Sequence, residues 1–177
     1  PAQYSIFYSA YVHGNQITGE RLRCISRIIN HSSTGEGVLT VVTTMDGIAD
    51  RLIPVERFKE AVITLDYSSE IEPEKLAKKL VAMGFVRTGM VEDKGQFAIR
   101  GGIIDIFSYT DEAPVRIELW DTEVDSIRMF DVESQRSIER LQSYSIFPAT
   151  EYIFTEDELK NGLYNIKKEC DRQLECF

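Results

Sequence analysis

The sequence has 177 residues, and its 43% hydrophobic and 28% charged residues are ordinary for a globular protein. A net charge of −9 argues against a domain that binds DNA mainly through phosphates, and favours a protein partner. We find no apolar run long enough to span a bilayer, so no membrane contact is expected. Three cysteines without a CxxC pair indicate a reducing, cytoplasmic setting, and two histidines make a His-rich metal site improbable. The first residue is not an initiator methionine, so we expect a longer parent protein.

Residues 1–61 predict part of an α/β domain. The segment TGERLRCISRIINH has apolar residues at helical spacing, with Thr18 as a candidate N-cap. The following segment GVLTVVTT, residues 37–44, is β-branched and apolar, which is typical of a strand buried on both faces of a parallel sheet. A short helix is expected next, ending before Pro54. These elements do not complete a parallel domain, so the rest must lie elsewhere.

Residues 62–146 predict a small α+β unit, an antiparallel sheet with one helix. The segment AVITLD reads as a strand, and EPEKLAKKLVAMGF as a helix that begins near Pro73 and is capped at its C-terminus by Gly84. Further strands are expected around Val91 and over residues 96–100, 103–107, 115–120, 124–130 and 138–146.

The last segment predicts an amphipathic helix. Thr155 and Glu158 match a capping box. An apolar stripe follows at helical spacing: Leu159, Leu163, Ile166, Cys170 and Leu174. We expect this stripe to dock on the first α/β segment of a monomer; pairing with a second copy is the alternative.

Two segments contain residue patterns that resemble catalytic sites. GNQITGER has the spacing of a phosphate-binding loop, but Glu20 replaces the lysine and Arg21 the hydroxyl residue, so a turn before a helix is expected instead. Asp46, Asp50 and Glu56 lie near one end of the expected strand, where helix capping and solvated faces explain them. No catalytic, metal or cofactor site is therefore expected in these residues.

The segment VRIELW places its only tryptophan on a polar face. Strand alternation points Val115, Ile117 and Leu119 toward the core, and Arg116, Glu118 and Trp120 to the other side. Either a helix or loop covers Trp120, or the residue belongs to an exposed Trp-Arg binding patch. The pattern alone leaves both possibilities open.

Alternation also applies to GQFAIRGGIIDIF, residues 95–107. It points Phe97 inward and Arg100 outward, and a bend or bulge at the two glycines then leaves Asp105 outside. From Arg87 to Arg140 six of seven basic residues are arginine, the type that interfaces favour. We therefore expect a one-sided sheet whose outer face carries charge and an aromatic residue.

Residues 84–152 closely resemble the UvrA-binding region shared by bacterial UvrB and the transcription-repair coupling factors (Mfd). The motifs that carry the resemblance are FAIRGGIIDIF, RIEL and DSIRMFD. The turn FDVESQRS favours the coupling factors over UvrB, which is the alternative. GVLTVVTTMDGIADRLIP also looks like helicase-like domain 1a of that family.

The resemblance implies three parts: residues 1–61 as the end of domain 1a, 62–146 as UvrA-binding domain 2, and 147–177 as the start of domain 1b. The family's UvrA contacts fall on Arg100, Arg116 and Trp120, the last usually a phenylalanine. It further implies that the full-length protein uses ATP and magnesium in a separate motor that acts on double-stranded DNA and displaces stalled RNA polymerase. By the same resemblance, this segment recruits UvrA and is not itself an enzyme.

Overall fold

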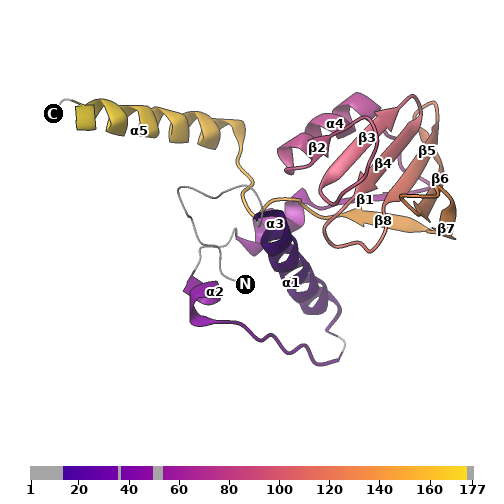
Figure 1. The fold of residues 1–177 in the computed structure, drawn as a ribbon, viewed down its shortest axis with the longest axis horizontal. Coiled ribbons are helices and arrows are strands. Elements are labelled where there is room, and N and C mark those ends of the chain that lie inside the picture. The colour runs from indigo at the N-terminus through magenta and orange to yellow at the C-terminus, as the bar shows by residue number, and fades with distance from the viewer. Residues whose placement is uncertain (1–13, 36, 50–53, 175–177) are drawn as a thin grey trace.

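The structure, a computed structural model, describes residues 14–35, 37–49 and 54–174 (Figure 1). It is a mixed α/β fold in which a small β-rich unit is flanked by helices from both ends of the chain. The helices are α1 (Gly14–Thr34), α2 (Met45–Ala49), α3 (Val55–Ala61), α4 (Pro73–Ala82) and α5 (Glu156–Leu174).

The main sheet has six strands in sequential order, antiparallel except for the parallel pair β2–β3. Its strands are β2 (Val86–Arg87), β3 (Gln96–Arg100), β4 (Ile103–Phe107), β5 (Val115–Trp120), β6 (Glu123–Phe130) and β7 (Ser137–Arg140). A separate antiparallel pair joins β1 (Ile63–Asp66) to β8 (Ser143–Ile146), so the unit begins and ends on paired strands.

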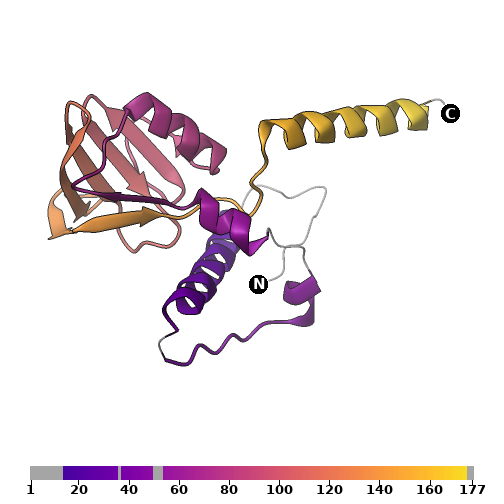
Figure 2. The same ribbon diagram turned by 180° about the vertical axis from the view of Figure 1, so that it is seen from behind.

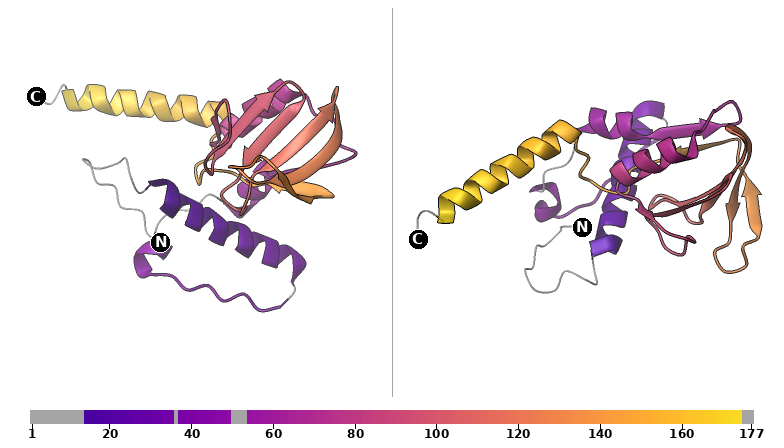
Figure 3. Two further views of the ribbon diagram at one scale, coloured as in Figure 1. Left: turned by 45° about the vertical axis from the view of Figure 1, so that its right-hand side comes forward. Right: turned by 90° about the horizontal axis from the view of Figure 1, so that it is seen from above.

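One face of the six-stranded sheet carries the core. Residues at alternate positions of β3 to β6 pack against α4 and the β1–β8 pair, and Figure 3 shows the helix lying across this face. The fully buried members on the sheet include Phe97, Ile104, Ile106, Ile117 and Ile127. Helix α4 contributes Leu76, Ala77 and Leu80, which are spaced three and four apart and so share one side of the helix.

Helix α1 forms a second, smaller core beside this unit (Figure 2). Leu22 and Phe58 are fully buried there, and Phe58 lies 6.5 Å, centroid to centroid, from the ring of Phe147. Tyr109 packs against both cores. The side chain of Arg21 is buried in an ion pair with Glu151, with 2.7 Å between nitrogen and oxygen.

Most elements of the β-rich unit agree with the sequence analysis. The predicted strands β3, β4 and β5 have the observed bounds, and α4 begins at Pro73. Gly84 follows this helix with a φ of +89°, as a left-handed C-terminal residue should. The capping box is also present, since the Glu158 N–H donates to Thr155 Oγ1 at 3.2 Å and the Thr155 N–H to Glu158 Oε2 at 2.9 Å.

Four local predictions were wrong. Thr18 is not an N-cap, because the helix already includes Gly14. The region around Val91 is not a strand; its side chain instead fills a small cluster with Ala98, Phe107 and Val132. Residues 138–146 form two strands in different sheets, because β7 pairs with β6 whereas β8 pairs with β1. The two glycines neither bend nor bulge a strand but form the turn of the β3–β4 hairpin.

The predicted buried strand at residues 37–44 does not form in the part of the chain that is described. Val38 and Val42 are 95% and 92% exposed. An extended apolar segment becomes a strand only when another strand pairs with it, and no described segment does so here. The parallel half of the predicted fold is consequently missing from the described residues.

Helix α5 forms as predicted but does not dock on any described part of the chain. It projects away from the other described elements (Figure 1), and its stripe residues Leu163 and Leu174 are 59% and 75% exposed. Its first turn is held by Arg57, which donates to both Glu158 carboxylate oxygens at 2.8 and 3.1 Å. None of the described helices is both long and apolar enough to cross a membrane.

Candidate protein-binding face

The side of the six-stranded sheet that points away from α4 is called here the outer face. Strand pairing places Ala98, Asp105, Arg116 and Arg128 in one row across it, on β3, β4, β5 and β6. Residues directly opposite in an antiparallel pair have side chains on the same face of the sheet. The row therefore places an acidic and two basic side chains on neighbouring strands of one face.

Asp105 is the centre of an ion-pair network with two arginines. Its Oδ1 accepts from Arg116 Nε at 2.6 Å, and its Oδ2 accepts from Arg116 Nη2 at 2.9 Å and Arg100 Nη2 at 2.7 Å. Asp105 is 1% exposed. The prediction that it lies outside was right about its face and wrong about its burial, because two guanidinium groups cover the carboxylate.

Several contacts fix the side chain of Arg116. Besides its two bonds to Asp105, its Nη2 donates to Gln135 Oε1 at 2.8 Å, and its guanidinium lies 4.3 Å from the centroid of the Phe130 ring. Hydrogen bonding to Asp105 raises the pKa of Arg116, against the opposing effect of burial. With only 13% of its side chain exposed, Arg116 supports the surface more than it presents itself to a partner.

Gln135 was not foreseen from the sequence. It has a φ of +57°, and its side chain donates to the Val132 carbonyl at 2.7 Å while accepting from Arg116. The Asp131 carboxylate accepts from the Ser134 N–H at 2.8 Å and fixes the same turn. The signal for this arrangement lies in the turn DVESQ, where an aspartate and a serine three residues later favour a closed turn.

Arg100 and Trp120 remain accessible on this face. The side chain of Arg100 is 45% exposed although it contacts Asp105. Trp120 is 80% exposed, so no described helix or loop covers it, and the alternative of a masked tryptophan is excluded for the described residues. The structure thus places the three predicted residues on one face, with Arg100 and Trp120 accessible and Arg116 only partly exposed.

The β3–β4 hairpin turn sets this arrangement. Gly101 has a φ of +61°, and a Cβ on Gly102 would lie 2.8 Å from the carbonyl oxygen of Leu119. The Leu119 N–H donates to that Gly102 carbonyl at 2.8 Å. This close approach brings the end of β5, and with it Trp120, beside the turn that follows Arg100.

The outer face is covered at one end. Val91 and Val132, from two loops, pack on Ala98 and Phe107 at one end. The expectation of a one-sided sheet therefore applies only to the end that carries Arg100 and Trp120.

The two segments that resemble catalytic sites have structural roles where they are described. Residues 14–21 are helical rather than a phosphate-binding loop, and Arg21 is committed to Glu151. Asp46 lies in the first turn of α2, whose Gly47 N–H donates to Thr44 Oγ1 at 3.2 Å; Asp50 lies outside the described residues. Among described residues, no group of three His, Cys, Asp or Glu side chains could hold a metal ion.

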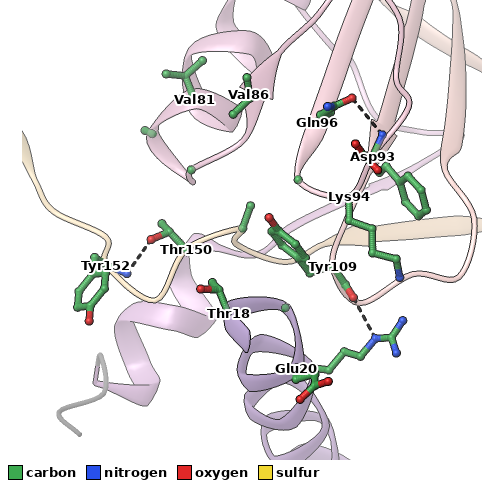
Figure 4. A pocket seen from close by; sticks show the side chains of 17 residues that line it. Thr18, Glu20, Val81, Val86, Asp93, Lys94, Gln96, Tyr109, Thr150 and Tyr152 are labelled. Carbon is green, nitrogen blue, oxygen red and sulfur yellow. Dashed lines mark hydrogen bonds between the residues drawn. The ribbon is translucent and has the colours of Figure 1, made fainter. Parts of the chain in front are cut away.

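A cavity of about 1150 Å³ lies between α1 and the sheet (Figure 4). Its two basic side chains are already engaged: the Lys94 amine donates to the Asp111 carbonyl, and Arg23 Nε donates to the Tyr109 carbonyl at 3.0 Å. Burial lowers the pKa of Lys94, and the nearby charge of Arg23 adds to this effect. The cavity presents no nucleophile with an adjacent base, so the outer face is the stronger candidate site.

Comparison with known families identifies the family of the β-rich unit. A model described as the UvrB interaction domain matches residues 63–152, from β1 to just beyond β8. The chain belongs to the UvrB interaction domain family. The matched region contains the whole outer face, including Arg100, Arg116 and Trp120.

The chain is similar to transcription-repair-coupling factors. The Bacillus subtilis protein is 44% identical over 151 residues, which are 85% of this chain and 12% of that protein. The proteins of Staphylococcus aureus strain MRSA252 and Staphylococcus haemolyticus are 38% and 40% identical over 90% and 82% of the chain. The chain spans only 12–14% of the length of these relatives, so it resembles one segment of them.

Proposed function

We propose that this chain is the UvrA-recruiting module of a transcription-repair coupling factor, acting in transcription-coupled nucleotide excision repair. The observation that carries the proposal is Trp120, which is 80% exposed on a sheet face that also presents Arg100. Tryptophan and arginine dominate binding hot spots, and a large exposed aromatic on a charged face is unusual without a partner. Membership of the UvrB interaction domain family supports the same reading.

The three predicted residues then have different roles. Trp120 and the free side of Arg100 make the contacts with UvrA, whereas Arg116 holds the Asp105 carboxylate and so fixes the direction of Arg100. Ion pairs made before binding reduce the side-chain entropy that is lost on association. The interface is thus preformed.

The remaining expectations concern the longer protein. Residues 1–61 and 147–177 belong to helicase-like domains 1a and 1b, and the exposed apolar surfaces of residues 37–44 and α5 support completion by further chain. A separate motor with ATP and magnesium moves on double-stranded DNA and displaces stalled RNA polymerase in the cytoplasm. This module itself binds no cofactor and catalyses no reaction.

Calorimetric titration of UvrA with the wild-type chain and the Trp120→Ala variant tests the proposal. Loss of a hot-spot side chain costs about 2 kcal/mol, so the dissociation constant should rise about 30-fold. Tyr164→Ala is the matched control, because Tyr164 is 66% exposed but lies on α5. Equal affinities of wild type and Trp120→Ala would remove Trp120 from the site, and absence of wild-type binding would refute the function.

A further inference from the structure

The arginines of the outer face continue beyond the three predicted residues. Strand pairing sets Arg116 opposite Arg128, and Arg128 opposite Arg140, on the adjacent strands β5, β6 and β7. Three arginines therefore stand side by side on one face, at the spacing of neighbouring strands. Like charges placed directly opposite in a sheet repel, so such a row needs compensating carboxylates.

Two of the three arginines have their carboxylates within the chain. Arg116 is paired with Asp105, and Arg128 with Glu118. Glu118 also accepts from Ser126 Oγ at 2.7 Å, so its position is fixed. Both pairs are largely shielded from water, since the arginine side chains are only 13% and 25% exposed.

Arg140 has no such compensation. Its side chain is exposed and makes no ion pair or hydrogen bond to any group in the described part of the chain. It lies on β7, one of the two edge strands of the six-stranded sheet. The β3 end of the row is Ala98, which is buried, so the row ends in accessible positive charge at Arg140, although the net charge of the whole chain is −9.

We propose that the partner-binding surface extends across the sheet to Arg140, and that a carboxylate-bearing segment of the protein partner lies along this row. The inference rests on the proposed function and deepens it, because it states the chemistry that UvrA must present. A phosphate backbone is disfavoured as the occupant because the strongly acidic chain would repel nucleic acid elsewhere on its surface.

The inference predicts a kinetic effect. An exposed charge at the rim of an interface acts mainly on the association rate and on its salt dependence. Arg140→Glu should therefore slow association with UvrA roughly tenfold at low salt, with the difference shrinking at high salt. Arg140→Lys keeps the charge and should restore most of the rate.

Surface plasmon resonance with immobilised UvrA makes the measurement on the whole chain. Lys78→Glu is the matched control, because Lys78 is exposed on α4, on the opposite side of the sheet, and the charge change is identical. Thermal unfolding confirms that each variant is folded, and Arg140→Gln replaces Arg140→Glu if the latter is not.

The outcomes separate the two proposals. Slower association for Arg140→Glu with an unchanged Lys78→Glu supports the inference. Equal rates for the two variants, or binding of a short DNA duplex that depends on Arg140 while UvrA affinity does not, would overturn it and leave the proposed function standing. If the wild-type chain does not bind UvrA, both proposals fall together.

Discussion

Asp105 explains why charged residues occupy an otherwise apolar pair of strands. It is buried, and its carboxylate accepts hydrogen bonds from both Arg100 and Arg116, so its charge is compensated within the chain. A buried ion pair is weak support for stability when compared with apolar packing, but removal of one partner leaves a buried charge uncompensated. The network therefore fixes the geometry of the outer face. The stability of the fold depends on the network staying complete.

Asp105→Ala should lower the free energy of unfolding by about 3 kcal/mol, because Arg116 would stay largely shielded from water without its carboxylate. Urea denaturation followed by circular dichroism measures this loss. Asp125→Ala, an exposed change on β6, should stay within about 0.5 kcal/mol of wild type. Adding Arg116→Met to Asp105→Ala should recover part of the stability; a loss that is equal with and without that second change would contradict the account.

At the scale of the element, α4 ends in a geometry that only its following glycine permits. The Phe85 N–H donates to the Leu80 carbonyl at 3.0 Å and the Gly84 N–H to the Val81 carbonyl at 3.0 Å, the two bonds of a Schellman motif. Gly84 has a φ of +89°, and a Cβ there would lie 2.8 Å from Thr150 Cβ. The segment after β8 thus packs directly on the helix end.

Gly84→Ala should destabilise the chain by about 1–2 kcal/mol from backbone strain, with the contact to Thr150 adding to it. The matched control is Gly89→Ala, where an added Cβ meets nothing within 4 Å and φ is not positive. Thermal or urea unfolding of both variants makes the comparison. Similar stabilities for the two alanine variants would show that the end of α4 adapts freely.

At the scale of the whole molecule, one buried tyrosine joins β8 to the loop after β4. Tyr144 is 6% exposed, and its hydroxyl donates to Asp111 Oδ2 at 2.5 Å. Burial raises the pKa of Tyr144 well above its usual value, and the charge and hydrogen bond of Asp111 raise it further. Burial also raises the pKa of Asp111, against the opposing effect of its hydrogen bonds.

The Tyr144–Asp111 pair makes the free energy of unfolding decrease at alkaline pH. The native state binds the Tyr144 proton more tightly than the unfolded state, whose tyrosine pKa is about 10. The stabilisation is therefore complete below about pH 10 and is lost as pH rises above it. The urea midpoint of the wild type should fall steeply above that pH, and that of Tyr144→Phe less steeply; parallel pH profiles would exclude Tyr144 as the cause.

The sequence by itself determined the local features of this chain. Alternation in VRIELW placed Trp120 on the polar face, and the pattern around Pro73 and Gly84 located α4, because side-chain period and backbone preference are properties of neighbouring residues. The motifs in residues 84–152 also pointed to the family that the UvrB interaction domain match shows. These signals need no knowledge of distant contacts.

Only the tertiary structure decided what depends on residues far apart in the chain. Asp105 is buried because Arg116, eleven residues away, and Gln135 beyond it close over the outer face. The apolar residues 37–44 have the composition of a buried strand, but burial requires a pairing partner, and none lies in the described residues. Alternation specifies which way a side chain points, whereas burial depends on what the rest of the chain places over it.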